Sequence, residues 1–129
     1  MFPIVLMMCA CAQTSVPQPS LCELSVNREN YAGRELVVTG QLLVSKHGSA
    51  VIDPLCDKGI PIEWHDSDLP KMRAFDEIAE RVQLEPLSVK VRVSGLVKRA
   101  PRSEFYDEPY WFLDLTSAQI LSQERLVEH

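Results

Sequence analysis

Two stretches of the chain carry mostly apolar and β-branched residues on either side of a central glycine. Residues 35–45 read Glu-Leu-Val-Val-Thr-Gly-Gln-Leu-Leu-Val-Ser, and residues 87–99 contain Val-Lys-Val-Arg-Val-Ser-Gly-Leu-Val. Such composition predicts a strand in each stretch. A glycine inside a strand marks a bulge or a sharp bend. Gly40 and Gly95 therefore predict two long strands that curl a small sheet into a closed barrel.

The second stretch alternates strictly, and its two faces differ in polarity. One face carries Val89, Val91, Val93 and Val97, and the other carries Lys90, Arg92, Ser94 and Lys98. Since side chains of a strand alternate between the two faces of its sheet, we expect the valines to be buried and the other face to contact water.

One segment, 69–83, has the periodicity of a helix. Its apolar residues recur every three or four positions, and Pro86 follows its end. The apolar stripe consists of Leu69, Met72, Phe75, Ile78, Ala79 and Val82. The stripe predicts packing against the core, and the charged residues between its members predict a solvated outer face.

Shorter segments complete the expected set of elements. Ser20 and Glu23 form a capping-box pattern, which predicts a short helix that carries Cys22. Three further strands are expected at 50–53, 60–64 and 110–121. The predicted order is a short helix, three strands, the long helix and two more strands.

Size and charge limit the function classes. A chain of 129 residues forms one domain, and its formal net charge is −5 with a pI of about 5.1. Affinity for a phosphate backbone comes largely from Lys and Arg, so an acidic balance disfavours nucleic acid as the main partner. A local basic groove is still compatible with this composition.

The N-terminal residues predict export. Residues 1–12 are uncharged and apolar, and a Gln-, Ser- and Pro-rich tether, 13–20, follows them. Met8-Cys9-Ala10-Cys11 resembles the lipobox of bacterial lipoproteins, which implies that Cys11 is lipidated and that Ala12 directs the protein to the outer membrane. A cleaved secretory signal and a buried N-terminal strand are the alternatives.

Two cysteines remain in the folded part. In an oxidising compartment, Cys22 and Cys56 are expected to form a disulfide. Closing a loop of about 34 residues would stabilise the fold by roughly 3.5–4 kcal/mol. The alternative is a pair of free thiols in a cytosolic protein. The spacing of Cys and His residues does not supply the four ligands of a zinc site, so no metal or cofactor is expected.

The order of elements resembles that of the OB-fold. The predicted fold class is mainly β: a five-stranded OB-fold-like Greek-key barrel with one helix between strands 3 and 4 and a short N-terminal helix. The domain would span 21–122, with a flexible tail at 123–129. Taken with the leader, the chain resembles small exported OB-fold proteins of bacteria, many of them predicted lipoproteins. SH3-like and other small barrels share part of the pattern.

The resemblance also implies a ligand surface. OB-folds bind ligands across strands two and three, between the first-to-second and fourth-to-fifth loops. Cations beside aromatic rings in these places can hold bases, sugars or peptides. The residues of this surface are Lys46, Trp64, Lys98, Arg99, Arg102, Tyr106 and Trp111, and it includes the 99–109 loop, which is longer than most hairpin connections. Acidic residues of the same loop offset its positive charge.

No set of residues in the sequence predicts catalysis. The chain has no glycine-flanked serine, phosphate-binding loop or paired metal-binding histidines. We therefore expect a non-enzymatic binding or accessory module in the bacterial periplasm, anchored to the outer membrane, with a protein, peptide or envelope polymer as its partner. An intracellular OB-fold binder of single-stranded nucleic acid is the alternative. A purely structural envelope component is the third possibility.

Overall fold

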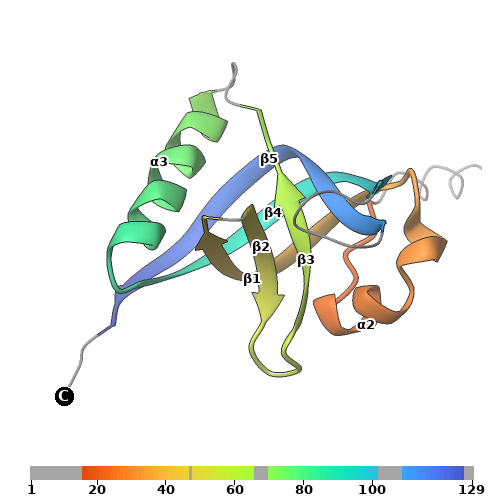
Figure 1. The fold of residues 1–129 in the computed structure, drawn as a ribbon, viewed down its shortest axis with the longest axis horizontal. Helices are drawn as coiled ribbons and strands as arrows, with labels where there is room; N and C mark the ends of the chain where they lie inside the picture. Colours follow the sequence, from red (N-terminus) through yellow and green to blue (C-terminus); the bar gives the residue numbers. More distant parts are fainter. Residues whose placement is uncertain (1–15, 47, 66–69, 102–108, 127–129) are drawn as a thin grey trace, which may run out of the picture.

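The computed structural model describes residues 16–46, 48–65, 70–101 and 109–126. Within these residues the chain is mainly β, with five strands and two α-helices. Figure 1 shows their arrangement. The elements in chain order are α2 (Leu21–Val26), the short 3-10 helix η1 (Arg28–Tyr31), β1 (Glu35–Ser45), β2 (Gly48–Asp53), β3 (Lys58–Glu63), α3 (Pro70–Leu84), β4 (Leu87–Ala100) and β5 (Tyr110–Arg125).

The five strands form a closed barrel in the order β1-β2-β3-β5-β4, and β4 pairs back onto β1. All neighbouring strands are antiparallel except β3 and β5, which run parallel over the short pairing of Ile62 and Glu63 with Leu113 and Asp114. The predicted closed barrel is confirmed. The valines at 89, 91, 93 and 97 are all buried inside it, as the alternation of β4 predicts.

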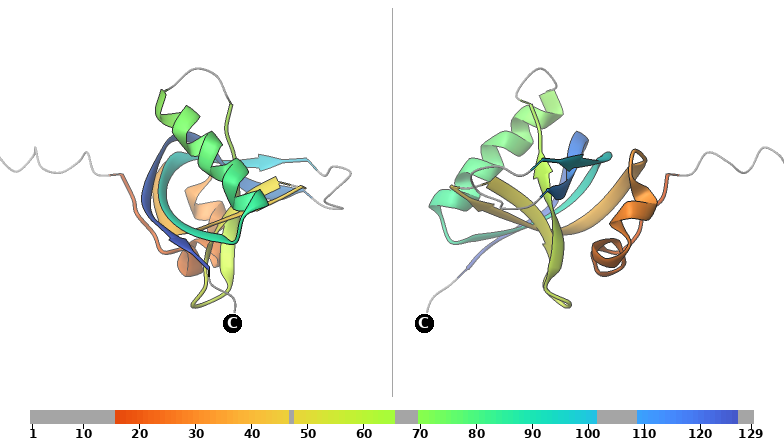
Figure 2. Two further views of the ribbon diagram at one scale, coloured as in Figure 1. Left: turned by 90° about the vertical axis from the view of Figure 1, so that its left-hand side faces the viewer. Right: turned by 45° about the vertical axis from the view of Figure 1, so that its right-hand side comes forward.

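Each end of the barrel is covered by a helix (Figures 1 and 2). α2 inserts Leu21 and Leu24 at one end, and both side chains are 1% exposed. α3 covers the other end with Met72, Phe75, Ile78 and Ala79. Neither helix, within the part of the chain that is described, has the length and apolar character needed to cross a membrane.

The two strand glycines mark places where backbones approach closely. β1 pairs with β4 as far as Gln41 and with β2 from Gln41 onward, so it changes neighbours beside Gly40. A Cβ atom on Gly40 would lie 2.5 Å from the carbonyl oxygen of Ile52 and 2.8 Å from a methyl group of Val51. A Cβ atom on Gly95 would collide with the backbone of Asp114, next to a bulge in the β4–β5 ladder. Glycine is thus needed at Gly40 and Gly95 because neighbouring atoms leave no room for a side chain.

Replacing Gly40 by alanine should therefore lower the free energy of unfolding by about 1–3 kcal/mol, the usual cost of overpacking a filled core. Urea denaturation measures this change. Thr39→Ala is the control, because Thr39 is exposed on the same strand, and its effect should stay within about 0.5 kcal/mol. Equal stability of Gly40→Ala and the wild type would contradict the close approach.

The C-terminal part of the fold differs from the prediction. β5 continues to Arg125, four residues past the expected strand end at Leu121, so 123–125 are not a tail. Arg125 pairs with Leu87, the first residue of β4. Residues 122–125 of β5 are all exposed, so both faces of the strand are polar here and no apolar alternation marks it as a strand. β2 and β3 each start two residues before the predicted positions.

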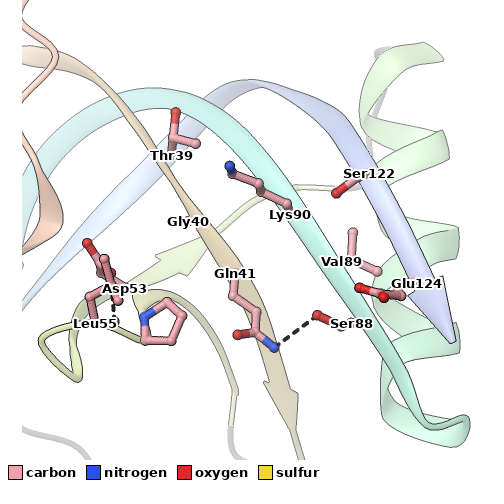
Figure 3. A pocket seen from close by; sticks show the side chains of 11 residues that line it. Thr39, Gly40, Gln41, Asp53, Leu55, Ser88, Val89, Lys90, Ser122 and Glu124 are labelled. Carbon is pink, nitrogen blue, oxygen red and sulfur yellow. Dashed lines mark hydrogen bonds between the residues drawn. The ribbon is translucent and has the colours of Figure 1, made fainter. Parts of the chain in front are cut away.

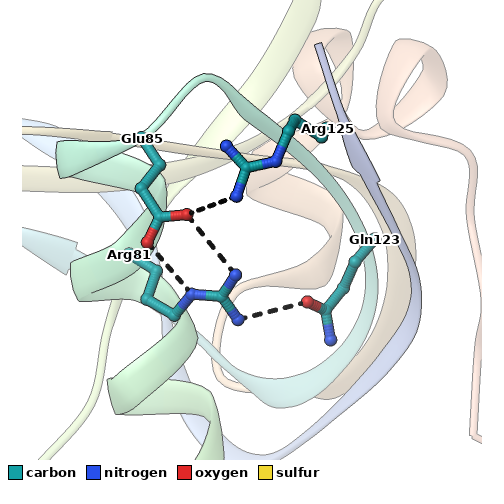
Figure 4. Close-up of polar contacts among 4 residues, drawn as sticks. All are labelled: Arg81, Glu85, Gln123 and Arg125. Carbon is teal, nitrogen blue, oxygen red and sulfur yellow. Dashed lines mark hydrogen bonds and ion pairs between the residues drawn. The ribbon is translucent and has the colours of Figure 1, made fainter.

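An exposed ion cluster connects the end of α3 to the end of β5 (Figure 4). Glu85 accepts from Arg81 at 3.3 Å and from Arg125 at 3.4 Å. Arg81 also donates to the amide oxygen of Gln123 at 3.5 Å. The hydrogen bond from Arg81, more than the charge of Arg125, holds the pKa of Glu85 below its ordinary value.

This lowered pKa predicts a pH dependence of stability. The unfolded chain takes up the Glu85 proton at a higher pH than the folded chain does, so the stabilisation is present above the ordinary pKa and is lost as pH falls through the folded pKa. The stability difference between the wild type and Glu85→Gln should therefore vanish between about pH 5 and pH 3. Chemical denaturation at each pH measures it. Parallel stability curves for the two proteins would contradict the prediction.

Candidate functional site

The outer face of β1, β2 and β3 carries a row of apolar side chains. Leu43 lies directly opposite Ala50, and Ala50 lies directly opposite Pro61, so the three residues share one face. The neighbouring row, formed by Leu42, Val51 and Ile60, is buried in the barrel, which identifies the Leu43 row as the outward one. Leu43 is 50% exposed.

A second row lies two residues farther along each strand. Gln41 is opposite Ile52, and Ile52 is opposite Gly59. A methyl group of Ile52 lies 2.7 Å from where a Gly59 Cβ would be, so the Ile52 side chain covers the bare backbone of β3. The two rows together form a largely apolar patch across three strands, which we call the outer β1–β3 face (Leu43, Ala50, Ile52, Gly59 and Pro61).

Two of the predicted site cations are engaged by neighbouring side chains. Lys98 donates to a carboxylate oxygen of Asp114 at 2.6 Å. Arg99 lies opposite Trp111 in the β4–β5 ladder, and its guanidinium carbon is 5.5 Å from the centroid of that ring. The structure thus brings Arg99 and Trp111 together, but Lys98 and Arg99 alternate to opposite sides of the strand.

Trp111 also lines a small polar hollow of about 240 Å³, whose other wall is the α2–η1 segment, 25–30.

Trp64 lies away from this hollow and packs against α3. Its indole N–H donates to a carboxylate oxygen of Asp76 at 2.9 Å, and its ring meets Phe75 edge-on at 5.0 Å. Trp64 therefore has a structural role, and its contact with a ligand stays a prediction.

The remaining predicted residues are spread over the chain. Lys46 is exposed at the turn between β1 and β2. Cys11, Arg102 and Tyr106 lie outside the described residues, as does most of the 99–109 loop. The described residues of the predicted surface are thus Lys46, Trp64, Lys98, Arg99 and Trp111.

A larger hollow of about 510 Å³ straddles the bend of β1 (Figure 3). Its lining mixes hydroxyl, amide and charged groups with the loop that follows β2; the main polar residues are Thr39, Gln41, Ser88, Lys90, Ser122 and Glu124. The Gln41 amide donates to the Ser88 hydroxyl at 3.3 Å across the floor. Leu55, at the tip of the loop, is 94% exposed.

The loop between β2 and β3, which we call the 53–57 loop, is tied down by the predicted disulfide. Cys22 of α2 and Cys56 are bonded, with their Cα atoms 6.1 Å apart, so that prediction is confirmed. One carboxylate oxygen of Asp53 accepts the N–H of Leu55 at 2.9 Å, which closes the turn. Asp57 adopts a positive φ of 59°. This wall of the hollow is thus fixed covalently to α2.

Sequence reasoning predicted a ligand surface across strands two and three but did not identify the apolar residues of the outer β1–β3 face, although a signal for them was present. Each of the three strands contains three consecutive apolar residues, at 42–44, 50–52 and 60–62. Consecutive apolar residues in a strand point to both faces of the sheet. Three such runs on neighbouring strands predict an apolar outer face as well as an apolar core.

The arrangement offers apolar contact on one face and mixed polar groups in one hollow. Comparisons of the chain with protein-family models, with curated proteins and with solved structures gave no match. The resemblance to small exported bacterial OB-fold proteins stays a prediction, and the functional proposal depends on the surfaces described above.

Proposed function

We propose that the chain is a non-enzymatic binding module built on an OB-fold, exported and anchored to the outer membrane through Cys11, which binds an extended segment of a partner protein. The strand order of the closed barrel and the position of α3 between β3 and β4 support the OB-fold assignment. The disulfide between Cys22 and Cys56 supports an oxidising compartment.

The outer β1–β3 face is the observation that carries the proposal. Its two rows are two residues apart along each strand, a distance of about 6.6–6.8 Å. Side chains on one side of an extended peptide have the same spacing. A segment with apolar residues at alternate positions can therefore place one side chain on each row, against Leu43 and against Ile52.

Charge favours a peptide over nucleic acid on this surface. A phosphate backbone needs Lys and Arg side chains that are free to displace counterions. Lys98 is held by Asp114, and Arg99 stacks on Trp111. The two rows of the outer β1–β3 face carry no cation, since they consist of apolar residues, glycine and the uncharged Gln41.

Replacing Leu43 by glutamate should weaken peptide binding at least about tenfold, since it puts a charge at the most exposed apolar side chain of the contact. The measurement is selection of displayed peptides on immobilised wild-type protein, followed by affinities of the selected peptides for each variant. Thr116→Glu, an exposed substitution on β5, adds the same charge and should leave affinity unchanged.

We expect the selected peptides to carry apolar residues at alternate positions. Equal loss in Leu43→Glu and Thr116→Glu would point to a general charge effect and contradict the proposal. Tight binding of single-stranded DNA at low salt would favour the nucleic-acid alternative instead. The mass of the mature N-terminus tests the anchor separately, because lipid on Cys11 adds a defined mass, whereas an intact Met1 in the cytosol would overturn export.

A further inference from the structure

We propose that Cys22, Cys56 and Asp53 form a binding site for a zinc-type metal ion when the disulfide is reduced. The two sulfur atoms and one carboxylate oxygen all lie within 4.8 Å of one another. Thiolate and carboxylate groups are ordinary zinc ligands, at about 2.3 Å and about 2.0–2.2 Å from the metal. Around a tetrahedral ion such ligand atoms are about 3–4 Å apart. The two sulfur atoms, which are bonded to each other in the oxidised protein, must therefore separate by roughly 1–2 Å after reduction, which rotation of the two side chains can supply.

The carboxylate of Asp53 is directed at the disulfide. Its Oδ2 atom lies 3.6 Å from the sulfur of Cys22. A disulfide sulfur carries no proton, so this contact is not a hydrogen bond in the oxidised protein. The other oxygen, Oδ1, accepts from the N–H of Leu55 at 2.9 Å, which fixes the direction of the carboxylate (Figure 3). Hydrogen bonds to the second oxygen of a ligating carboxylate orient it in metal sites in the same way.

One dithiol reductant is sufficient to open the site by reducing the disulfide. A dithiol attacks the Cys22–Cys56 bond, transfers two electrons and leaves as its own disulfide, so that both cysteines become thiols. A divalent ion then displaces the two thiol protons and binds two thiolates and the Asp53 carboxylate. A water molecule can take the fourth position of a tetrahedral site.

The structure also gives the site an entry path. Cys22, Cys56 and Asp53 are each partly exposed, and Asp53 lines the 510 Å³ hollow. Metal binding at this site is independent of the proposed peptide binding, which uses the outer β1–β3 face. In an oxidising compartment the disulfide is formed and the sulfur atoms cannot act as thiolate ligands. Metal binding therefore depends on the redox state of Cys22 and Cys56.

Cobalt(II) is the spectroscopic probe for the test, and zinc(II) is its competitor. The protein is the full chain with Cys9→Ser and Cys11→Ser, so that sulfur ligands come from Cys22 and Cys56 alone. After anaerobic reduction, we expect one cobalt ion per chain, with a thiolate-to-metal charge-transfer band and tetrahedral absorption that zinc then abolishes. The oxidised protein should show neither.

Asp53→Asn should weaken cobalt affinity at least about tenfold. Asp57→Asn is the matched control, because it removes the same charge from the same loop and asparagine tolerates the positive φ of that position. Equal affinity of Asp53→Asn and Asp57→Asn, or binding by the oxidised protein, would overturn the site. If the reduced chain is unfolded without metal, zinc should restore its β-type circular dichroism; thiolate binding without this recovery would also overturn it.

Discussion

Replacing Cys22 and Cys56 together by serine is expected to lower the free energy of unfolding by about 3–4 kcal/mol. The bond closes a loop of 34 residues and joins α2 to the 53–57 loop. The unfolded chain without this link gains conformational freedom, which is the main source of the loss. Because small domains are stable by only about 5–15 kcal/mol, the change is a large fraction of the total.

Urea denaturation of oxidised wild type and of the double variant measures the effect. Reduced wild type in the absence of metal is the control, since it loses the bond but keeps the sulfur atoms. If reduced wild type and the variant unfold at the same urea concentration, below that of oxidised wild type, the covalent link accounts for the difference. Unchanged stability in both would contradict the prediction.

The barrel could be predicted because its signals are local. Alternating valines in 87–99 and the apolar stripe of 69–83 each report one buried face, and the structure buries both. The disulfide could be predicted because the folded part offers only one pair of cysteines. The observed ends of strands differ from the predicted ends by a few residues where exposed segments carry no apolar pattern, as at 123–125.

The surfaces were harder to predict because they depend on which strands become neighbours. Trp64 appears from sequence as a free aromatic ring, but α3 returns to the barrel and places Asp76 and Phe75 against it. Asp53 appears as a loop residue, but the fold brings it to the sulfur of Cys22, which lies 31 residues away in sequence. Contacts of this kind follow from strand order and register, which no local pattern reports.

The core beneath α3 gives the second large effect. Phe75 is 1% exposed and is among the largest fully buried side chains among the described residues. Phe75→Ala should lower the free energy of unfolding by about 3–5 kcal/mol, because it removes buried apolar area and leaves a cavity. Phe75→Leu keeps most of the volume and should cost less than about 1.5 kcal/mol.

Trp64 supplies a local readout for the same variant. Its ring meets Phe75 edge-on, and its N–H bond to Asp76 depends on α3 staying in place. Phe75→Ala should therefore shift Trp64 fluorescence in the folded state, whereas the Cys22 and Cys56 double variant should not. Trp111→Phe removes the other tryptophan and makes the assignment of the signal direct.

The two large effects should be nearly additive, because α2 and α3 cover opposite ends of the barrel (Figure 2) and distant sites couple weakly. Their sum of about 6–9 kcal/mol falls within the total stability expected for a domain of this size. A protein with all three substitutions should thus be close to unfolding at 25 °C, and far-UV circular dichroism would show it. A well-folded triple variant would mean that one end of the barrel contributes much less than its burial indicates.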